Sequence, residues 1–409
     1  MNIFIFAANW YNHGDEAALR AMIDELKILY PDCRMKIQFN QKVTAFCYQD
    51  IEILQGFSKP VGRNKLKLIP YNLSVACAGR INLVSRKERM AFAAFVQALK
   101  WADYAIFAPG GPSLGDHYRQ YQLLDMMYLM GRFHVPYAIF APSMGPFTNY
   151  RNRIRKVLRN AEVICFREEI SKGYFDELKT GKKAIVTLDS AFQHPVAIEP
   201  SERLLIRDAA LLRFLDMHER VVGITITDLS WHREYRDTDI TVTIRDTFTQ
   251  FIDMLCEKNI GVLFIPQLFG MSDDSSYMTS FAGENTFVVA NDYDCYFQQY
   301  LISRLYAVVG MRYHSNIFAA KMGTPFISVS YEQKMKGFME KADLNRYCIP
   351  IAELSCERLA SCFGELTRSY DAYKEHLMGN KDKYREKAYY TTEVVSSSIN
   401  QVISNTAAC

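Results

Sequence analysis

Short apolar runs alternate with helical patterns along most of this chain. The run at residues 3–8 precedes residues 16–30, whose apolar side chains recur at the spacing of an amphipathic helix. Further apolar runs follow at residues 104–108, 137–141 and 163–166. Strands separated by helices of this length are typical of a parallel sheet with crossover helices. The first part of the chain is therefore predicted to form a doubly wound α/β domain.

A second series of the same kind begins after the strand rhythm lapses. A helical stretch at residues 204–217 interrupts the pattern, and another helical pattern lies near residues 241–258. The new strand candidates span residues 221–227, 262–266, 286–290, 307–310 and 326–330. A chain of 409 residues also exceeds the usual size of one hydrophobic core, so two domains are expected.

The two series together predict two Rossmann-like doubly wound α/β domains with a cleft between them, an arrangement that resembles the GT-B architecture. We expect an N-terminal domain on the acceptor side over residues 1–195 and a C-terminal domain over residues 219–369. A linker over residues 196–218 is expected to join them, and a helical tail over residues 370–409 to follow. Ligands of open parallel sheets bind beyond the carboxyl ends of the strands. The loops after the strands are therefore where functional residues are expected.

Composition excludes several classes of protein. A hydrophobic fraction of 49% and a charged fraction of 23% fit an ordinary soluble globular protein, and a net charge of +3 gives no basic surplus for nucleic acid. The ten cysteines form no C-x-x-C pair, so we expect reduced core residues and no metal site. No apolar run reaches the ~18 residues of a membrane span, and no signal peptide is recognisable. These features predict a cytoplasmic protein.

The loop after residues 3–8 gathers polar side chains around a glycine at a helix start. Asn12, His13 and Asp15 surround Gly14. One interpretation is structural, with Asp15 as the helix cap and Gly14 as the turn. Capping needs only one such residue. The alternative is that the loop binds acceptor hydroxyls, together with the free N–H groups of the helix start.

Glycines dominate the loop that follows residues 104–108. Gly110, Gly111 and Ser113 allow a ligand to approach the backbone, and successive N–H groups there can form an anion-binding nest. The loop lacks the Lys-Ser/Thr ending of a P-loop and the G-x-G-x-x-G spacing of dinucleotide-binding proteins. Asp116 closes the loop, either as a simple cap or as a base or hydroxyl ligand.

Arg167 stands at the carboxyl end of the strand predicted at residues 163–166. A guanidinium there can bind a phosphate or carboxylate through two parallel hydrogen bonds. The alternative is an ion pair with Glu168 or another neighbour. The preceding helix, residues 151–159, has a basic face that is either simply solvated or in peripheral contact with the inner face of a membrane.

The most specific loop follows residues 307–310. Arg312, His314 and Ser315 stand at a helix start, where the helix dipole also favours negative charge. An arginine and a histidine in this position suit a small polyanion. Lys334, after the next predicted strand, is expected to add another cation at the same rim.

In their order along the chain, these motifs resemble those of the polysaccharide pyruvyl transferase family. N-x-G-D-E begins at Asn12, and G-G-x-S-L-x-D, R-E-x-x-S, G-x-R-x-H and G-x-P-x-x-x-x-x-Y-x-x-K follow as far as Lys334. The ordered set extends over most of the chain. The chain departs from the family's pattern in two places, at Pro112 in the glycine loop and at the pair Asn12 and His13 before Gly14. These departures bear on acceptor recognition more than on the reaction.

The resemblance implies a GT-B-like fold, phosphoenolpyruvate as the donor, and a cell-surface glycan or its lipid-linked oligosaccharide precursor as the acceptor. The reaction has no redox step, so no cofactor is expected. The donor's carboxylate and phosphate are expected to contact Arg312, Arg167, Lys334 and Ser315. The acceptor sugar is expected to contact Asn12, His13, Gly14, Gly110, Gly111 and Ser113.

A mechanism follows from these expectations. Free histidine titrates near pH ~6.5, so we expect His314 to protonate the methylene carbon of the donor as a general acid. Asp116 or Asp15 is expected to take the proton of the attacking hydroxyl. Loss of phosphate and attack by a second hydroxyl would then close a cyclic ketal during exopolysaccharide synthesis.

Two other functions compete with this one. A GT-B glycosyltransferase would bind a nucleotide-sugar in the C-terminal domain through an acidic residue, for which Asp273, Asp274 and Glu332 are candidates. A non-catalytic protein of the same fold would capture a sugar phosphate without turnover. Such a protein would have no need of the cationic residues described above.

Overall fold

The chain folds into two compact units, each built around one parallel sheet. The computed structural model describes residues 1–58, 68–78, 80–86, 88–111, 113–116, 120–270 and 273–407. Unit 1 comprises Met1–Trp10, Ala18–Ser190 and Lys387–Cys409, and unit 2 comprises Tyr11–Ala17 and Ala191–Glu386. The predicted fold class, two Rossmann-like α/β domains, is confirmed.

The sheet of unit 1 has the strand order β3-β2-β1-β4-β5-β6-β7, and the described strands pair in parallel. In chain order they are β1 Asn2–Ala8, β2 Arg34–Phe39, β3 Glu52–Gln55, β4 Tyr104–Phe107, β5 Tyr137–Ile139, β6 Val163–Phe166 and β7 Ile185–Val186. The central strands β4 and β5 are buried at every residue, because helices cover both faces of a parallel sheet.

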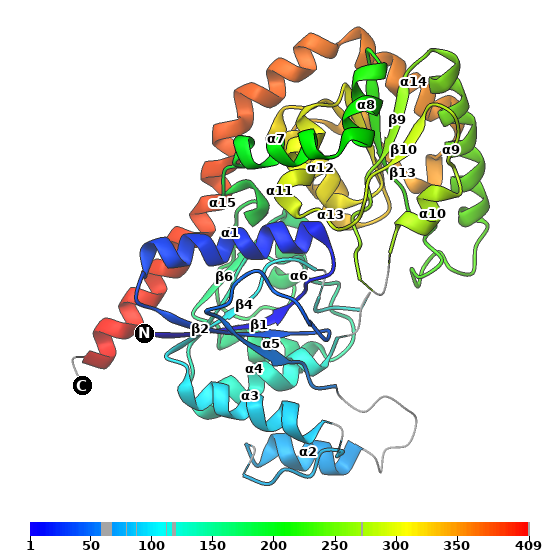
Figure 1. The fold of residues 1–409 in the computed structure, drawn as a ribbon. Helices are drawn as coiled ribbons and strands as arrows, with labels where there is room; N and C mark the ends of the chain where they lie inside the picture. The colour runs from blue at the N-terminus through cyan, green and yellow to red at the C-terminus, as the bar shows by residue number, and fades with distance from the viewer. Residues whose placement is uncertain are drawn as a thin grey trace. The chain divides into compact units, whose positions relative to one another are not determined.

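Helices α3, α4 and α5 lie on one face of this sheet and α1 lies on the other (Figure 1). The helices are α1 His13–Leu29, α2 Leu68–Ala76, α3 Arg89–Trp101, α4 Gln122–Phe133, α5 Arg151–Arg159 and α6 Glu169–Asp176. Aromatic rings fill the core on the α3 face, where Phe4 of β1 meets Phe95 of α3 edge to face at 5.5 Å. Helix α5 buries Ile154, Val157 and Leu158, so the apolar face that the helical spacing predicted is buried.

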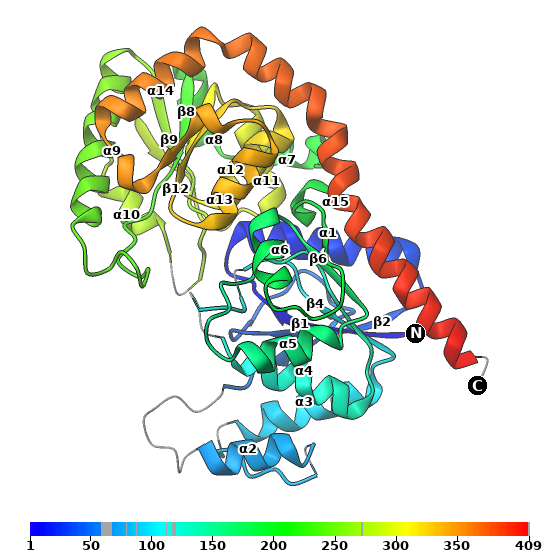
Figure 2. The ribbon, with the colours of Figure 1, turned by 180° about the vertical axis from the view of Figure 1, so that it is seen from behind.

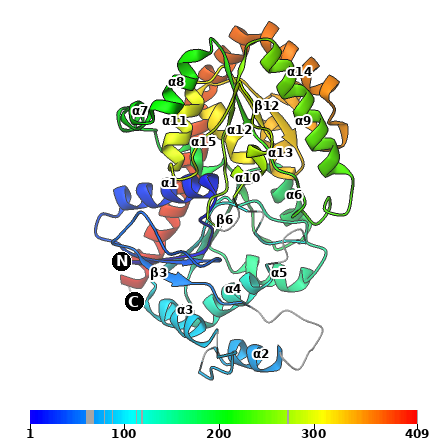
Figure 3. The same cartoon turned by 45° about the vertical axis from the view of Figure 1, so that its right-hand side comes forward.

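The sheet of unit 2 has the strand order β10-β9-β8-β11-β12-β13, again parallel. The strands are β8 Val221–Thr225, β9 Gly261–Phe264, β10 Thr286–Val288, β11 Ala307–Gly310, β12 Phe326–Ser330 and β13 Cys348–Pro350. Helices α9 Ile240–Glu257 and α14 Cys356–Arg368 lie together on one face (Figure 3). Unit 2 also contains α10 Ser275–Thr279, α11 Cys295–Ser303, α12 Tyr313–Met322 and α13 Gln333–Lys341.

Residues 196–218, predicted as a linker, form two helices of unit 2. Helix α7 spans Ile198–Arg207 and α8 spans Ala209–Met217. They bury Leu205, Leu211 and Phe214, so these apolar residues at helical spacing serve packing. The two units divide between Ser190 and Ala191.

The chain ends in the helix α15, Tyr370–Ala407, which belongs partly to each unit (Figure 2). In unit 2 the Tyr373 hydroxyl donates to the carbonyl of Phe326 at 2.8 Å. In unit 1 the Ser398 hydroxyl lies 2.8 Å from that of Tyr104. Neither α15 nor any other helix in the described ranges is long and apolar enough to cross a membrane.

Candidate active site

The most specific predicted loop turns sharply between β11 and α12. Gly310 ends β11 and has no room for a side chain, because a Cβ atom there would lie 2.0 Å from Asn316 Oδ1. The buried Ser315 hydroxyl donates to the Arg312 carbonyl at 2.7 Å and lies 2.7 Å from the Thr225 hydroxyl. These contacts give Ser315 a structural role at the start of α12, and its contact with the donor stays a prediction.

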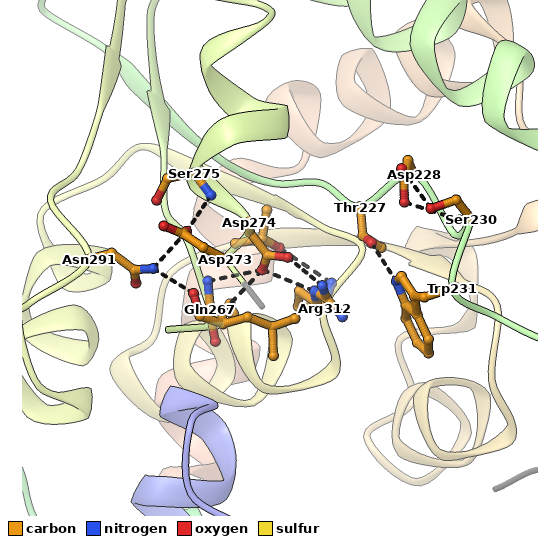
Figure 4. A network of polar contacts seen from close by, with 12 residues as sticks. Thr227, Asp228, Ser230, Trp231, Gln267, Asp273, Asp274, Ser275, Asn291 and Arg312 are labelled. Carbon is orange, nitrogen blue, oxygen red and sulfur yellow. Dashed lines mark hydrogen bonds and ion pairs between the residues drawn. The ribbon is translucent and has the colours of Figure 1, made fainter. Parts of the chain in front are cut away.

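Arg312 forms a buried ion pair with Asp274. Its Nε atom donates to Asp274 Oδ2 at 3.2 Å, and a terminal nitrogen donates to Oδ1 (Figure 4). The same Oδ2 atom accepts from the backbone nitrogens of Gln267 and Leu268, at 3.2 and 3.1 Å. Burial would lower the pKa of Arg312, but Asp274 and Tyr331 outweigh it and raise that pKa above its ordinary value. Arg312 is therefore a firmly held cation just before α12.

The neighbouring Asp273 is also engaged. It accepts hydrogen bonds from the Ser275 backbone at 2.7 Å and from the Asn291 amide at 2.8 Å (Figure 4). The adjacent residues Asp273 and Asp274 therefore both stabilise loops of unit 2. From the sequence they were candidates for ribose binding only, and the ion pair of Asp274 with Arg312 was not predicted.

Trp231 lies over the guanidinium of Arg312. The Arg312 Cζ atom is 5.6 Å from the ring centroid, and Trp231 Nε1 donates to the Thr227 hydroxyl at 3.0 Å (Figure 4). A cation above a tryptophan ring is stabilised electrostatically. Trp231 is 44% exposed whereas Arg312 is 7% exposed, so the ring is the more solvent-accessible partner of this contact.

His314 packs against the N-terminus of α1. A Cβ atom added to Gly14 would lie 1.9 Å from both Cγ and Nδ1 of His314. Gly14 is the second residue of α1, and no turn requires it. Its role is to let the His314 ring approach the helix backbone closely. The structure thus joins the N-x-G-D-E and G-x-R-x-H motifs within unit 2.

The chain that leads into α1 pairs with the loop after β9. Asn12 forms an antiparallel bridge with Leu268, and the His13 backbone nitrogen donates to the Gln267 carbonyl at 2.9 Å. The Asn12 side chain accepts from the Gly14 nitrogen at 2.8 Å. Asn12 is therefore the helix cap, a role that the structural interpretation had given to Asp15.

His13 and Glu16 form a second buried pair on the first turn of α1. His13 Nδ1 lies 2.9 Å from Glu16 Oε2, which also accepts from the Cys295 backbone nitrogen at 3.1 Å. The His13 ring stacks on Phe269 with centroids 4.4 Å apart. Sequence analysis missed Glu16, although the N-x-G-D-E motif contains it. These contacts fix the start of α1 in unit 2.

Lys334, the further cation expected from the sequence, forms an ion pair. Its ammonium group is 2.5 Å from Glu332 Oε2 and 5.8 Å from the centroid of the Tyr313 ring. His232 approaches the same carboxylate at 3.8 Å. Glu332, the third ribose candidate, therefore has two basic neighbours.

Arg167 belongs to unit 1 and is fully enclosed. Its guanidinium donates to Asp189 at 2.5 Å, to the Ser143 hydroxyl at 2.8 Å and to the Gly111 carbonyl at 2.9 Å. The side chain has no exposed surface. These contacts favour the ion-pair interpretation over phosphate binding, with Asp189 as the partner in place of Glu168. Arg167 ties together the loops that follow β4, β5 and β7.

The rest of the R-E-x-x-S motif is structural in the same way. Glu168 caps α6 by accepting from the Ser171 backbone nitrogen at 2.8 Å, and it also accepts from the Ser171 hydroxyl. That hydroxyl in turn accepts from the Met144 nitrogen at 2.8 Å. The motif therefore holds the loop after β5 against α6.

Asp116 has the contacts of a structural carboxylate. It accepts from the Thr148 nitrogen and hydroxyl at 2.7 and 2.6 Å, from the Asn149 amide at 2.7 Å and from the Tyr121 hydroxyl at 2.9 Å. Burial raises the pKa of Asp116, but these hydrogen bonds outweigh it and hold the pKa well below its usual range. A carboxylate so stabilised is a weak base, which favours Asp15 for that role.

The glycine loop after β4 has the backbone freedom that was predicted. Gly110 and Gly111 have φ angles of 112° and 94°, in the region that favours glycine. The Gly110 carbonyl accepts from the Ser143 nitrogen at 3.0 Å, and Ser113 is buried. Pro112 lies outside the described residues.

The predicted residues therefore belong to two different units. Within unit 2 the structure brings together the two motifs that contain Gly14 and His314, with Arg312 two residues before His314. Asn12, His13 and Asp15 belong to the same unit, whereas Arg167, Asp116, Gly110, Gly111 and Ser113 belong to unit 1. No group of three His, Cys, Asp or Glu side chains in the described ranges is arranged to hold a metal ion.

Comparison with known proteins adds a family and a fold. A family model described as polysaccharide pyruvyl transferase matches residues 12–333. The chain resembles UDP-GlcNAc 2-epimerase from Neisseria meningitidis bound to UDP-GlcNAc at 10% identity and a TM-score of 0.58, over 98% of this chain and 100% of that one. It resembles a UGT transferase from Siraitia grosvenorii in complex with UDP at 8% identity and 0.57, over 98% and 100%. Such low identities show the shared fold alone.

Proposed function

The chain belongs to the polysaccharide pyruvyl transferase family, and from that premise we propose that it transfers the pyruvyl group of phosphoenolpyruvate to sugar hydroxyls and closes a ketal. The acceptor is a glycan or lipid-linked precursor of a cell-surface polysaccharide. The observation that carries this proposal is the position of Arg312 and His314 at the start of α12, with the His314 ring packed on Gly14.

The donor's two anionic groups need positive partners. The N-terminus of α12 offers backbone N–H groups and the positive end of a helix dipole, and no side-chain cap occupies it. Arg312 stands next to it as a held cation. Because Asp274 compensates the charge of Arg312, the guanidinium serves mainly to orient the donor. The helix terminus and His314 supply the additional attraction for the donor's anionic groups. Lys334, although paired with Glu332, remains a second candidate cation.

His314 is the residue we assign to protonation of the donor's methylene carbon. Histidine is the side chain best suited to exchange a proton near neutral pH. The tight packing of its ring on Gly14 fixes the ring's position. As the hydroxyl oxygen bonds to the central carbon, the methylene becomes a methyl group. Phosphate then leaves, and the second hydroxyl takes its place to complete the ketal.

Asp15 is the residue we assign to the proton of the attacking hydroxyl. It follows Gly14 directly and belongs to the same unit as His314. Asp116, the other candidate from the sequence, is engaged in hydrogen bonds within unit 1 and has a lowered pKa.

A second candidate function is glycosyl transfer from a nucleotide-sugar. The observation in its favour is the fold, which the chain shares with proteins whose structures contain UDP or UDP-GlcNAc. The three acidic residues considered for ribose binding are each engaged by other groups of unit 2, Asp274 by Arg312 among them. The pyruvyl transfer therefore has the stronger support.

Phosphate release from phosphoenolpyruvate tests the choice between the two functions. The protein is incubated with the donor, with or without a pool of lipid-linked glycan intermediates, and in parallel with UDP-sugars. We expect acceptor-dependent release that Arg312→Ala abolishes and that the exposed-site control Arg203→Ala, on α7, retains. Release from no acceptor mixture, together with hydrolysis or transfer from a UDP-sugar, would contradict pyruvyl transfer.

A further inference from the structure

Unit 2 contains a pocket that the donor site does not use. Its cavity measures about 480 Å³, and its lining includes residues at the carboxyl ends of β12 and β13 and at the start of α13. All of its lining residues fall between Tyr235 and Ala352, so unit 2 alone builds it. This volume is within the range of ~300–1,000 Å³ typical of small-molecule sites. The carboxyl edge of a parallel sheet is also where such sites occur.

The charges in the pocket wall compensate one another. Lys336 and Glu340, one turn apart on α13, lie 3.7 Å from each other. Glu332, the third charged residue of the lining, is compensated from outside the lining by Lys334 at 2.5 Å and has His232 at 3.8 Å. A phosphate or carboxylate would find no surplus of positive charge here, and a cation would find no surplus of negative charge. The ligand that this wall fits is uncharged.

The rest of the lining is aromatic, apolar and amide-bearing. Tyr235 and Tyr331 are the aromatic residues of the lining, Ile351 is an apolar one, and Gln333 and Asn345 are residues with neutral amides. A pyranose ring presents apolar C–H faces to an aromatic wall and a rim of hydroxyls to amide groups, which can donate and accept. The lining therefore matches a neutral sugar better than a lipid or an anion.

Tyr331 links the pocket to the donor site. Its side chain accepts a hydrogen bond from Arg312, and its backbone carbonyl accepts one from the Tyr235 hydroxyl at 3.4 Å. We propose that the pocket binds a neutral pyranose of the acceptor and so presents its hydroxyls to the donor held at the start of α12. This inference rests on the proposed function and narrows the acceptor to uncharged sugars. It also assigns the acceptor's contacts to this pocket of unit 2, whereas the sequence predicted contacts at the glycine loop of unit 1.

Glycoside binding, measured apart from turnover, tests the proposal. The probes are the methyl β-glycosides of glucose, galactose and mannose, with methyl β-glucuronide as the charged counterpart, and binding is measured by saturation-transfer NMR. Ala352→Trp fills the pocket, and Ala372→Trp makes the same change at another exposed alanine of unit 2. Tyr235→Ala removes one aromatic wall, and Tyr235→Phe keeps it. Thermal unfolding shows whether each variant is folded.

We expect at least one neutral glycoside to bind and the glucuronide to bind more weakly. Ala352→Trp and Tyr235→Ala are expected to weaken that binding by about tenfold or more, the equivalent of one or two hydrogen bonds, while both control variants keep it. Calorimetric binding of phosphoenolpyruvate should be the same in all four variants. Equal binding by Ala352→Trp and the wild type, stronger binding of the glucuronide, or no binding of any glycoside would each overturn the proposal.

The two proposals fail in different ways. Wild-type protein that binds a neutral glycoside in this pocket but neither binds nor consumes phosphoenolpyruvate would contradict the proposed function and leave the pocket's ligand class intact. Acceptor-dependent consumption of phosphoenolpyruvate that Ala352→Trp leaves unchanged, at any acceptor concentration, would contradict the pocket assignment alone.

Discussion

Replacement of Gly14 by alanine tests whether the position of the His314 ring matters for the reaction. Alanine in place of glycine stabilises a protein by ~0.5–1 kcal/mol at an interior helix position, and this is the upper limit for Gly14, the second residue of α1. Here the new methyl group would lie 1.9 Å from two atoms of the His314 ring. Non-bonded carbon atoms require ~3.5 Å or more, so the ring must move by roughly 1.5 Å or α1 must shift.

The two effects on stability oppose each other. Overpacking of this kind costs about 1–3 kcal/mol, which exceeds the gain in helix propensity. We therefore expect Gly14→Ala to be less stable than the wild type by up to ~2 kcal/mol. The effect on turnover should be larger, because a misplacement of ~1 Å in a reacting group can cost ~10²-fold. We expect turnover at least ~10²-fold below that of the wild type.

Phosphate release under saturating donor measures turnover, and urea denaturation measures stability. Gly379→Ala is the matched control, since Gly379 is also in a helix of unit 2 and a Cβ atom there meets nothing within 4 Å. That variant should be as active as the wild type and slightly more stable. A Gly14→Ala protein that keeps wild-type turnover would refute the claim that His314 acts from the position described here.

Three further substitutions test the structural roles found for carboxylates and arginine. Burial opposes ionisation of Asp116, but its hydrogen bonds lower its pKa. The stabilisation of the fold by this carboxylate is therefore present at neutral pH and is lost as the pH falls below ~4. The urea curves of the wild type and Asp116→Asn should converge toward pH 2, and a constant gap between them would contradict this. Asp274→Asn should lower the free energy of unfolding by roughly 3–5 kcal/mol, because it leaves the buried Arg312 without its partner; an unchanged urea midpoint would exclude that ion pair. Arg167→Lys should lower the free energy of unfolding by roughly 3 kcal/mol without raising the KM for phosphoenolpyruvate. A raised KM in a variant as stable as the wild type would restore Arg167 as a donor contact.

The fold was predictable wherever strands are apolar throughout. Residues 163–166 form β6 with the predicted limits, and residues 307–310 form β11. Strand β2, Arg34–Phe39, was not predicted, because charged residues alternate with apolar ones in its first half. Strand β13 is only three residues long. Strands such as these form because their neighbours pair with them, which no local pattern records.

Candidate site residues could be chosen from the sequence where they lie within one loop. Arg312 and His314 are two residues apart at a helix start, and that spacing alone marks them. Asp274 was not predictable as the partner of Arg312, because the two are 38 positions apart in the sequence. The reason for Gly14 was equally hidden, since it depends on a histidine that approaches from α12. Contacts of this kind depend on how distant segments pack.

The central claim is that His314 protonates the donor's methylene carbon during pyruvyl transfer. Transfer from phosphoenolpyruvate to a glycan acceptor in D₂O, followed by mass spectrometry of the product, tests it most directly. We predict one deuterium in the methyl group of each ketal, and a rate that falls ~10²–10⁴-fold in His314→Gln while donor binding persists. Formation of the same product at the wild-type rate by His314→Gln would contradict the claim.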